Sequence, residues 1–237
     1  MKKNEINWVF DIDGTLTPSR LRIDPVFEAF FLDWMAERNV YLVTGSDAPK
    51  TIEQVGEKIW KSANRVFQSC GNQIFEAGEI IYENPWKPSD DLIQYLEELL
   101  LESSCLEKTS NHIETRIGLL NFSPVGRDCT QEQRITYNDW DTESGERLRF
   151  AKMIEEKFPD LEASVGGQIS IDIHPRGANK SQVRDLIEGP IWFFGDKTGP
   201  GGNDKPLADA LSVPDQVFAV ENPEHTQQLL ETLCDTI

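Results

Sequence analysis

The sequence has few basic residues, few cysteines and no long apolar run. Its 237 residues include 23 Lys and Arg against 41 Asp and Glu, which gives a formal net charge of −18. This balance argues against nucleic acid and anionic membranes as partners, because both are bound through a basic face. No stretch reaches the roughly 18 consecutive apolar residues of a membrane-spanning helix, and the beginning has no apolar segment typical of a signal peptide. We therefore expect a soluble, cytoplasmic protein.

The four cysteines support the same expectation. They are isolated from one another, without the paired spacing of a metal site, at Cys70, Cys105, Cys129 and Cys234. Reduced thiols in a reducing compartment are the simplest interpretation of this pattern. The hydrophobic fraction of 38% is sufficient for an ordinary globular core.

The two ends of the chain alternate short apolar runs with helical segments. Near the beginning, the pattern predicts a strand at 8–10, a helix at about 24–38 and a strand at 40–43. Near the end, it predicts a helix from about residue 180, strands at 191–194 and 217–220, and a closing helix. Such alternation indicates parallel strands joined by right-handed crossovers.

The middle of the chain follows another pattern. It predicts helices at 89–102 and near 142–157, with strands near 113–123, 161–165 and 168–174. Strands that follow one another in this way indicate an antiparallel sheet with helices on one face. We therefore predict an α/β protein. Its Rossmann-like parallel-sheet core would comprise residues 1–82 plus 177–237, and an α+β cap of residues 83–176 would be inserted into it.

A polar loop with two carboxylates follows the first predicted strand. Asp11 and Asp13 are one residue apart, and Gly14 permits a sharp turn after them. Ligands of an open parallel sheet bind beyond the carboxyl ends of the strands, where this loop is expected. One carboxylate can attack phosphorus and become an acyl phosphate, while the other exchanges a proton with the leaving oxygen.

A carboxylate and a phosphate repel each other, so such a site needs positive charge. Magnesium suits it because this ion prefers oxygen ligands. Asp196 follows another apolar strand, and Asn203 and Asp204 come shortly after it. Lys180 can place a charge beside the phosphoryl group, and Thr44 can donate a hydroxyl hydrogen bond. Singly, each is more often a turn residue, a helix cap or a solvated side chain, but their positions after four separate predicted strands favour a common site.

Taken in chain order, these residues resemble the four-motif pattern of the haloacid dehalogenase superfamily: Asp11 to Thr15, then Thr44, then Lys180, then Gly195 and Asp196 with Asn203 and Asp204. The resemblance implies that Asp11 is the nucleophile and Asp13 the general acid and base. It also implies magnesium held by Asp11, by the backbone carbonyl of Asp13 and by Asp196. Thr44 and Lys180 would then bind the phosphoryl group, with Asn203 and Asp204 in support.

The middle segment carries a set of arginines in an otherwise acidic protein. Arg116, Arg127 and Arg134 lie within 19 positions. A guanidinium grips phosphate with two hydrogen bonds and keeps its charge, so the set is a candidate phosphate site. Surface arginines paired with neighbouring acids are an equally simple interpretation.

A predicted strand in the same segment alternates apolar and polar residues. Its apolar face carries Ile169, Ile171 and Ile173. On the other face, Ser170 and Asp172 suit the binding of phosphate and sugar hydroxyls. An ordinary half-buried strand gives the same pattern, and we assign His174 to that structural interpretation.

Several longer stretches resemble the eukaryotic-type phosphomannomutases. They are LLNFSPVGRDCTQEQR, GGQISIDIHPRG, FFGDKTGPGGND and TLTPSR, the last of which contains Arg20. The likeness is collinear over nearly the whole chain. It implies hexose-phosphate contacts from Arg20 and from the arginines, serine and aspartate of the middle segment. It also implies a homodimer formed through the caps.

The resemblance leads to a functional hypothesis. We expect a phosphomannomutase that interconverts mannose 6-phosphate and mannose 1-phosphate and feeds GDP-mannose synthesis. Its cofactors would be Mg²⁺ and a hexose 1,6-bisphosphate activator. The alternative is a magnesium-dependent sugar-phosphate phosphatase that uses the same two aspartates. A catalytically silent sugar-phosphate sensor is a third hypothesis, and the complete set of catalytic residues argues against it.

Overall fold

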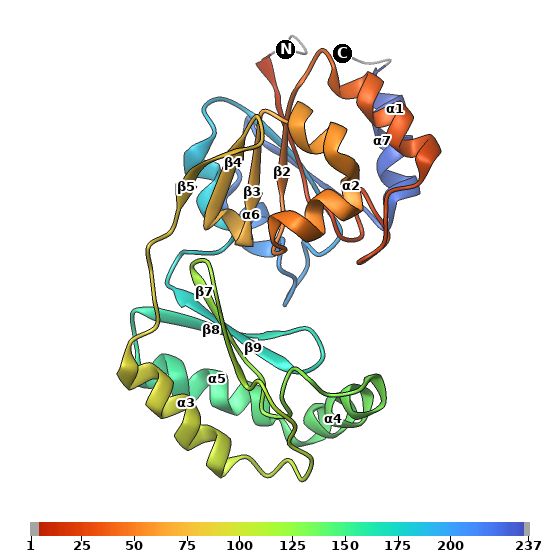
Figure 1. Ribbon diagram of the computed structural model, residues 1–237. Helices are drawn as coiled ribbons and strands as arrows, with labels where there is room; N and C mark the ends of the chain where they lie inside the picture. The colour runs from red at the N-terminus through yellow and green to blue at the C-terminus, as the bar shows by residue number, and fades with distance from the viewer. Residues whose placement is uncertain (1–4, 235–237) are drawn as a thin grey trace. The chain divides into compact units, whose positions relative to one another are not determined.

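The computed structural model describes residues 5–234, which form two compact units. Unit 1 consists of the chain up to Glu83 and from Ala178 onward, and unit 2 consists of Asn84–Gly177. In Figure 1 the red-to-orange beginning and the blue end of the chain share one unit, and the yellow-green to cyan middle forms the other. Within the described residues, no helix combines the length and apolar character needed to cross a membrane.

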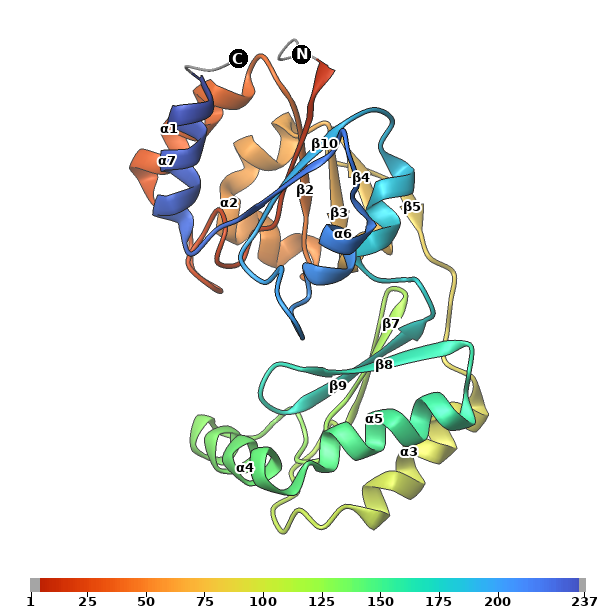
Figure 2. The same ribbon diagram turned by 180° about the vertical axis from the view of Figure 1, so that it is seen from behind.

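Unit 1 is built on a seven-stranded sheet in the order β11-β10-β1-β2-β3-β4-β5. Its strands are β1 (Asn7–Phe10), β2 (Asn39–Val43), β3 (Arg65–Gln68), β4 (Gln73–Glu76), β5 (Glu79–Glu83), β10 (Ile191–Gly195) and β11 (Gln216–Ala219). The five strands from β11 to β3 pair in parallel, and β4 and β5 are antiparallel additions at one edge. Helical segments lie on both sides of this sheet (Figure 2).

Those segments are α1 (Pro25–Met35), α2 (Ala48–Ser62), α6 (Lys205–Ala210), α7 (Pro223–Cys234) and the 3₁₀ helices η2 (Ser69–Gly71) and η3 (Lys180–Leu186). Because side chains alternate along a strand, β1 serves two cores. Trp8 and Phe10 pack with residues of α1, α2 and α7, whereas Val9 packs with residues of η3 and α6. Every residue of β1 is buried, as expected for a parallel strand covered on both faces.

Unit 2 has a four-stranded antiparallel sheet in the order β6-β7-β9-β8. Its strands are β6 (Ile113–Arg116), β7 (Leu119–Phe122), β8 (Leu161–Gly166) and β9 (Ser170–Pro175), and its helices are α3 (Asp90–Glu102), α4 (Gln131–Ser144) and α5 (Glu146–Lys157). Leucines of α3 and Phe150 and Ile154 of α5 share one core with Phe122, Ile171 and Ile173 of the sheet. Helices α3 and α5 therefore cover the same sheet face.

The helix starts follow from local chemistry. Asp24 caps α1 by accepting hydrogen bonds from the N–H groups of Val26 and Phe27 at 2.8 and 3.1 Å, and Pro25 occupies the first turn. Ser89 caps α3 in the same manner. Helix α1 ends at Met35, three residues before the predicted end.

One expectation about the elements was wrong, and three strands were missed. Instead of one charged helix near 142–157, the chain forms α4 and α5, because Gly145 turns the backbone at φ +65° between them and Thr130 and Gln133 start α4 with a reciprocal capping box. Strands β3, β4 and β5 were not predicted. The helix expected from about residue 180 is present as a 3₁₀ helix that begins at Lys180 and follows β9 of unit 2.

Candidate active site

The loop after β1 brings the first aspartate to the edge of the parallel sheet. Asp11 is 2% exposed, and its N–H continues the ladder by donating to the carbonyl of Phe194 at 2.9 Å. Gly14 has φ +87°, and a Cβ atom there would lie 2.3 Å from Oδ2 of Asp196. Only glycine therefore lets the β1 and β10 loops approach so closely. Asp11 and Asp196 come from adjacent strands, since Phe10 pairs with Phe194.

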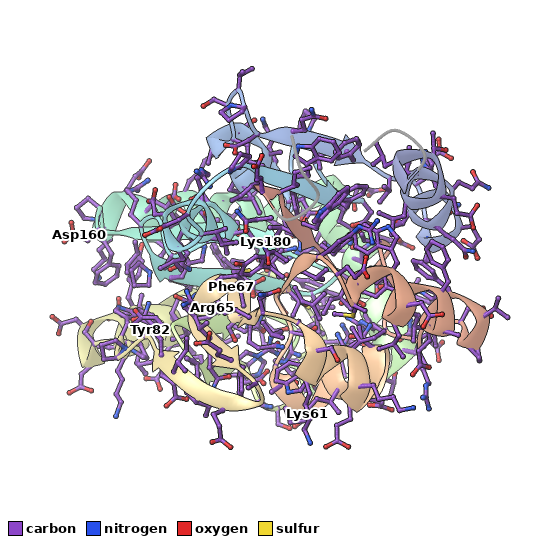
Figure 3. All side chains as sticks on the ribbon, turned by 90° about the horizontal axis from the view of Figure 1, so that it is seen from above. Lys61, Arg65, Phe67, Tyr82, Asp160 and Lys180 are labelled. Carbon is purple, nitrogen blue, oxygen red and sulfur yellow. The ribbon has the colours of Figure 1, made fainter. Side chains whose placement is uncertain are left out.

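A buried lysine links Asp11 to a second carboxylate. Lys180, which is labelled in Figure 3, is fully buried. Its Nζ donates to Asp11 Oδ1 at 2.5 Å and to Asp204 Oδ1 at 2.6 Å. Asp204 also accepts a hydrogen bond from the N–H of Lys197 at 3.0 Å. Its carboxylate makes no side-chain cap at the start of α6, which was the alternative interpretation of this residue.

Burial and charge act together on these groups. Burial, reinforced by the charges of Asp204 and Asp196 and opposed by Lys180, raises the pKa of Asp11 to about 7. Burial alone would lower the pKa of Lys180, but Asp11 and Asp204 outweigh it and raise that pKa. Lys180 therefore keeps its charge and favours the ionised nucleophile.

The carboxylate cluster fits a divalent cation. One oxygen from each of Asp11, Asp196 and Asp204 lies within 4.8 Å of the others. Burial raises the pKa of Asp196, and its Oδ1 is buried with no hydrogen-bond partner among residues 5–234. A bound cation would satisfy this orphaned acceptor, and hard oxygen ligands are those that Mg²⁺ prefers. Asp13, which we predicted to contribute a backbone carbonyl, does not add its carboxylate to this cluster.

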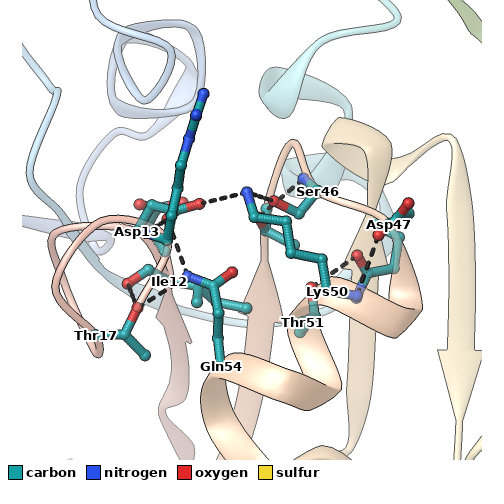
Figure 4. Close-up of polar contacts among 12 residues, drawn as sticks. Ile12, Asp13, Thr17, Ser46, Asp47, Lys50, Thr51 and Gln54 are labelled. Atoms are coloured by element: carbon teal, nitrogen blue, oxygen red, sulfur yellow. Dashed lines mark hydrogen bonds and ion pairs between the residues drawn. The ribbon is translucent and has the colours of Figure 1, made fainter. Parts of the chain in front are cut away.

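The carboxylate of Asp13 is held by other partners (Figure 4). Its Oδ1 accepts hydrogen bonds from the N–H of Arg20 at 2.6 Å and from Nε2 of Gln54 at 2.9 Å. Lys50 Nζ lies 3.7 Å from Oδ2. Burial by itself would raise the pKa of Asp13, but the two hydrogen-bond donors and the charge of Lys50 outweigh it and lower that pKa. The group is therefore an ionised base at neutral pH.

The sequence analysis missed Lys50 and Gln54. Both lie on α2, one helical turn apart, on the side that meets the β1 loop (Figure 4). Their four-residue spacing after the β2 loop is the one feature that could have indicated them. Thr44, at the end of β2, is 1% exposed, and its Oγ1 accepts a hydrogen bond from the N–H of Ser46 at 3.1 Å. Its hydroxyl hydrogen can still be donated to a ligand.

Unit 2 contains a separate polar network around Arg127. The Arg127 Nη1 donates to Asn121 Oδ1 at 2.9 Å and to Ser170 Oγ at 3.1 Å. Asn121 in turn donates to Asp172 Oδ1 at 2.6 Å. Three predicted substrate contacts thus belong to one network, and Asn121, which the sequence analysis missed, connects them.

Glu114 is the acidic partner within this network. It lies 2.5 Å from Nε of Arg127 and accepts two hydrogen bonds from Arg116 at 3.2 and 3.1 Å. Burial lowers the pKa of Arg127, and the positive charges of Arg116 and Arg134 lower it further. The negative charge of Glu114 acts in the opposite direction and raises it. The three predicted arginines therefore influence one another, and Glu114 is a further residue that the sequence analysis missed.

Comparison with known proteins identifies the family. The sequence model of the family described as "Eukaryotic phosphomannomutase" matches residues 27–236. The chain belongs to this family. The phosphomannomutase of Drosophila melanogaster is 34% identical, and the match covers 99% of this chain and 98% of the relative. Human phosphomannomutase 1 is 33% identical, with 96% of this chain and 91% of the relative covered. The family predicted from the sequence motifs is confirmed.

Solved structures support the fold. A haloacid dehalogenase-like hydrolase from Bacteroides thetaiotaomicron has a TM-score of 0.65 at 13% identity, covering 98% of this chain and all of that one. The IMP-nucleotidase of Plasmodium falciparum has a TM-score of 0.63 at 17% identity, covering 98% of this chain and 68% of that one. At such identities the likeness concerns the fold alone, and it confirms the predicted haloacid dehalogenase-like fold.

For this member of the phosphomannomutase family, the predicted residues divide into groups. Asp11, Lys180, Asp196 and Asp204 are in contact or close together in unit 1, and Arg127, Ser170 and Asp172 belong to one network in unit 2. Two predicted residues have exposed side chains, Arg20 and Asn203. His174 is 8% exposed and its Nδ1 lies 3.0 Å from the carbonyl oxygen of Pro175, which agrees with its structural interpretation.

Proposed function

We propose that this chain is a phosphomannomutase that interconverts mannose 6-phosphate and mannose 1-phosphate. The observation that carries the proposal is the buried Asp11 carboxylate beside Lys180, with the orphaned oxygen of Asp196 close by. Membership of the eukaryotic phosphomannomutase family and the names of its relatives support it. In a cell the product would feed GDP-mannose synthesis in the cytoplasm.

In this proposal Asp11 carries the phosphoryl group. A hexose 1,6-bisphosphate first phosphorylates Asp11. Asp13, which must take up a proton before this step, gives that proton to the sugar oxygen that leaves. O1 of mannose 6-phosphate then attacks the aspartyl-phosphate while Asp13 takes the O1 proton, and a bisphosphate forms. After the bisphosphate reorients, Asp11 takes the 6-phosphoryl group and Asp13 returns the proton to O6, which releases mannose 1-phosphate.

Positive charge at the site is needed throughout. Lys180 neutralises part of the charge on Asp11 and on the phosphoryl group that approaches it. Asp11, Asp196 and the backbone carbonyl of Asp13 would hold Mg²⁺, with Asp204 and Asn203 in support. Bound there, Mg²⁺ would offset the charge of the transferred group. Thr44 would donate its hydroxyl hydrogen to a phosphoryl oxygen.

The phosphate that is not transferred needs its own site. We assign it to Arg116, Arg127 and Arg134, with Ser170 and Asp172 binding the sugar hydroxyls. Arg20 would be a further phosphate contact. Binding of the second phosphate keeps the bisphosphate on the enzyme until it has reoriented. A phosphatase does not need this second phosphate site, whereas a mutase does. Residues 83–176 would therefore act as the specificity cap, and we also propose that they form a homodimer.

One assay tests the proposal. The enzyme is given mannose 1-phosphate, Mg²⁺ and glucose 1,6-bisphosphate, and mannose 6-phosphate and free phosphate are measured together. We expect isomer formation to exceed phosphate release greatly, and the opposite ratio would identify a phosphatase. The Asp11→Asn variant should lose both reactions, whereas Asp209→Asn, which changes an exposed aspartate, should keep them. Retained turnover in Asp11→Asn would overturn the assignment.

A further inference from the structure

Gln54 is a buried amide beside the proposed acid and base. Its side chain is on α2 and the residue is 2% exposed. Nε2 donates to Asp13 Oδ1 at 2.9 Å and to Thr17 Oγ1 at 3.2 Å (Figure 4). The opposite amide orientation would place an oxygen against the carboxylate, so Asp13 determines which way the amide points.

This arrangement has a cost for stability. Oε1 of Gln54 is buried and has no hydrogen-bond partner within the described part of the chain. An unsatisfied buried acceptor of this kind costs about 1–3 kcal/mol. An apolar residue of similar volume would avoid that loss. Such a residue could not replace the hydrogen bonds that Nε2 donates to Thr17 and to Asp13, and of these two acceptors only Asp13 has a proposed role in the reaction.

The backbone of Gln54 fixes the same loop. Its carbonyl accepts a hydrogen bond from the N–H of Ile23 at 2.8 Å. Arg20, in the loop that leads to Ile23, gives its N–H to Asp13 Oδ1. Helix α2 leaves helical geometry at Gly56, where φ is +81°, just after this contact. Gln54 thus joins α2 both to the Asp13 carboxylate and to the loop that supplies its other donor.

The two oxygens of Asp13 are therefore different. Oδ1 receives two hydrogen bonds, from Arg20 and Gln54, whereas Oδ2 lies 3.7 Å from the Lys50 ammonium. The charge of Lys197 also acts on the carboxylate. An oxygen with two donors is a poor site for a proton, whereas the second oxygen can still gain one.

We propose that Gln54 is a positioning residue for Asp13. It holds Oδ1 in place so that Asp13 exchanges its proton with the sugar oxygen at Oδ2. The inference rests on the proposed role of Asp13 as general acid and base. Gln54 itself touches neither the substrate nor the transferred group.

The choice of phosphoryl donor separates this role from a purely structural one. When a hexose 1,6-bisphosphate phosphorylates Asp11, the bond from phosphorus to the sugar oxygen breaks, and that oxygen needs the proton of Asp13. When acetyl phosphate does so, the leaving group is acetate, which is stable as an anion and needs no proton. Loss of Gln54 should therefore slow the first reaction and spare the second.

The experiment measures phosphorylation of Asp11 in single turnovers, with Mg²⁺ and labelled glucose 1,6-bisphosphate or labelled acetyl phosphate. For Gln54→Leu we expect the rate with the bisphosphate to fall roughly 10- to 100-fold, because small misplacements of a reacting group can have effects of this size. With acetyl phosphate the rate should stay within about twofold. In steady state, kcat should fall while KM for mannose 1-phosphate stays nearly constant.

The single-turnover experiment on Gln54→Leu includes a control variant and a second variant of Gln54. Thr51→Val changes a buried polar side chain one turn earlier on α2, where Thr51 Oγ1 lies 3.1 Å from the side-chain amide of Gln68, and should leave both rates unchanged. Gln54→Met, with an unbranched side chain, repeats the test if the leucine variant does not fold. Equal losses with both donors, or no loss with either, would overturn the inference. A wild-type enzyme that neither donor phosphorylates would instead overturn the proposed function.

Discussion

Replacing Lys180 with methionine should destabilise unit 1 far more than its single charge suggests. The lysine is fully buried, and its Nζ touches Asp11 at 2.5 Å and Asp204 at 2.6 Å. Methionine keeps most of the aliphatic stem, so the cavity term is small. The variant leaves two buried carboxylates without their shared cation. The free-energy change then reports the electrostatics of the cluster.

The expected size follows from burial. Removing one partner of a buried ion pair destabilises a protein by about 3–5 kcal/mol, because the remaining charge has neither water nor a counterion. For a chain of this length, such a loss lowers the melting temperature by roughly 6–20 °C. An exposed pair of the same length contributes much less, since water already solvates both groups.

Lys205 provides the matched comparison. Its Nζ lies 2.6 Å from Asp209, but the two side chains are 39% and 63% exposed. Lys205→Met makes the same substitution and should cost only about 0.3–0.5 kcal/mol. Urea unfolding of the full chain, followed by tryptophan fluorescence in EDTA, measures both variants. If the two losses agree within about 1 kcal/mol, the argument from burial is wrong.

Two further predictions concern the carboxylates. Magnesium at about 100 times its dissociation constant should raise the free energy of unfolding by about 2.7 kcal/mol in thermal-shift assays. Asp196→Asn should abolish this gain and Asp209→Asn should retain it. In unit 2, burial by itself would raise the pKa of Glu114, but Arg116 and Arg127 outweigh it and lower that pKa below its ordinary value of 4.5. The ionised Glu114 therefore stabilises the fold fully above about pH 4.5. This contribution is lost as the pH falls through the lower pKa of the folded state. Glu114→Gln should flatten the dependence of the unfolding free energy on pH below 4.5, and an unchanged slope would refute the assignment.

The parts of the site that follow strands could be predicted from sequence. Asp11 and Asp196 each come after a short apolar run, and parallel strands place their carboxyl ends at one edge. The register of β1 and β10 shows how this works, because Phe10 pairs with Phe194, and Asp11 and Asp196 follow that pair within two residues. A local pattern was enough because the loops are short.

The partners of these residues could not be predicted in the same way. Lys180 is 169 positions from Asp11 in sequence, and unit 2 is inserted before it. In the sequence Gln54 is indistinguishable from any polar residue of an amphipathic helix. The 3.6-residue periodicity of the helix indicates which face Gln54 occupies, but not which loop packs against that face. Helix α4 was missed for a related reason. Its composition is polar, and its two ends are marked only by local features, the capping box of Thr130 and Gln133 and the turn at Gly145.

The arginines of unit 2 show why two interpretations of a pattern need not exclude each other. Sequence left open whether they bind phosphate or pair with acids, and Arg127 does pair with Glu114. The side chains of Arg127 and Glu114 are 26% and 34% exposed. A pair this accessible is worth roughly 0.2–1 kcal/mol, so a doubly charged phosphate would displace the carboxylate with little loss. Asn121 and Ser170 would keep the guanidinium in place during the exchange, because both contact Nη1 while Glu114 contacts Nε. The acid would then hold the arginine in position until a phosphate replaces it.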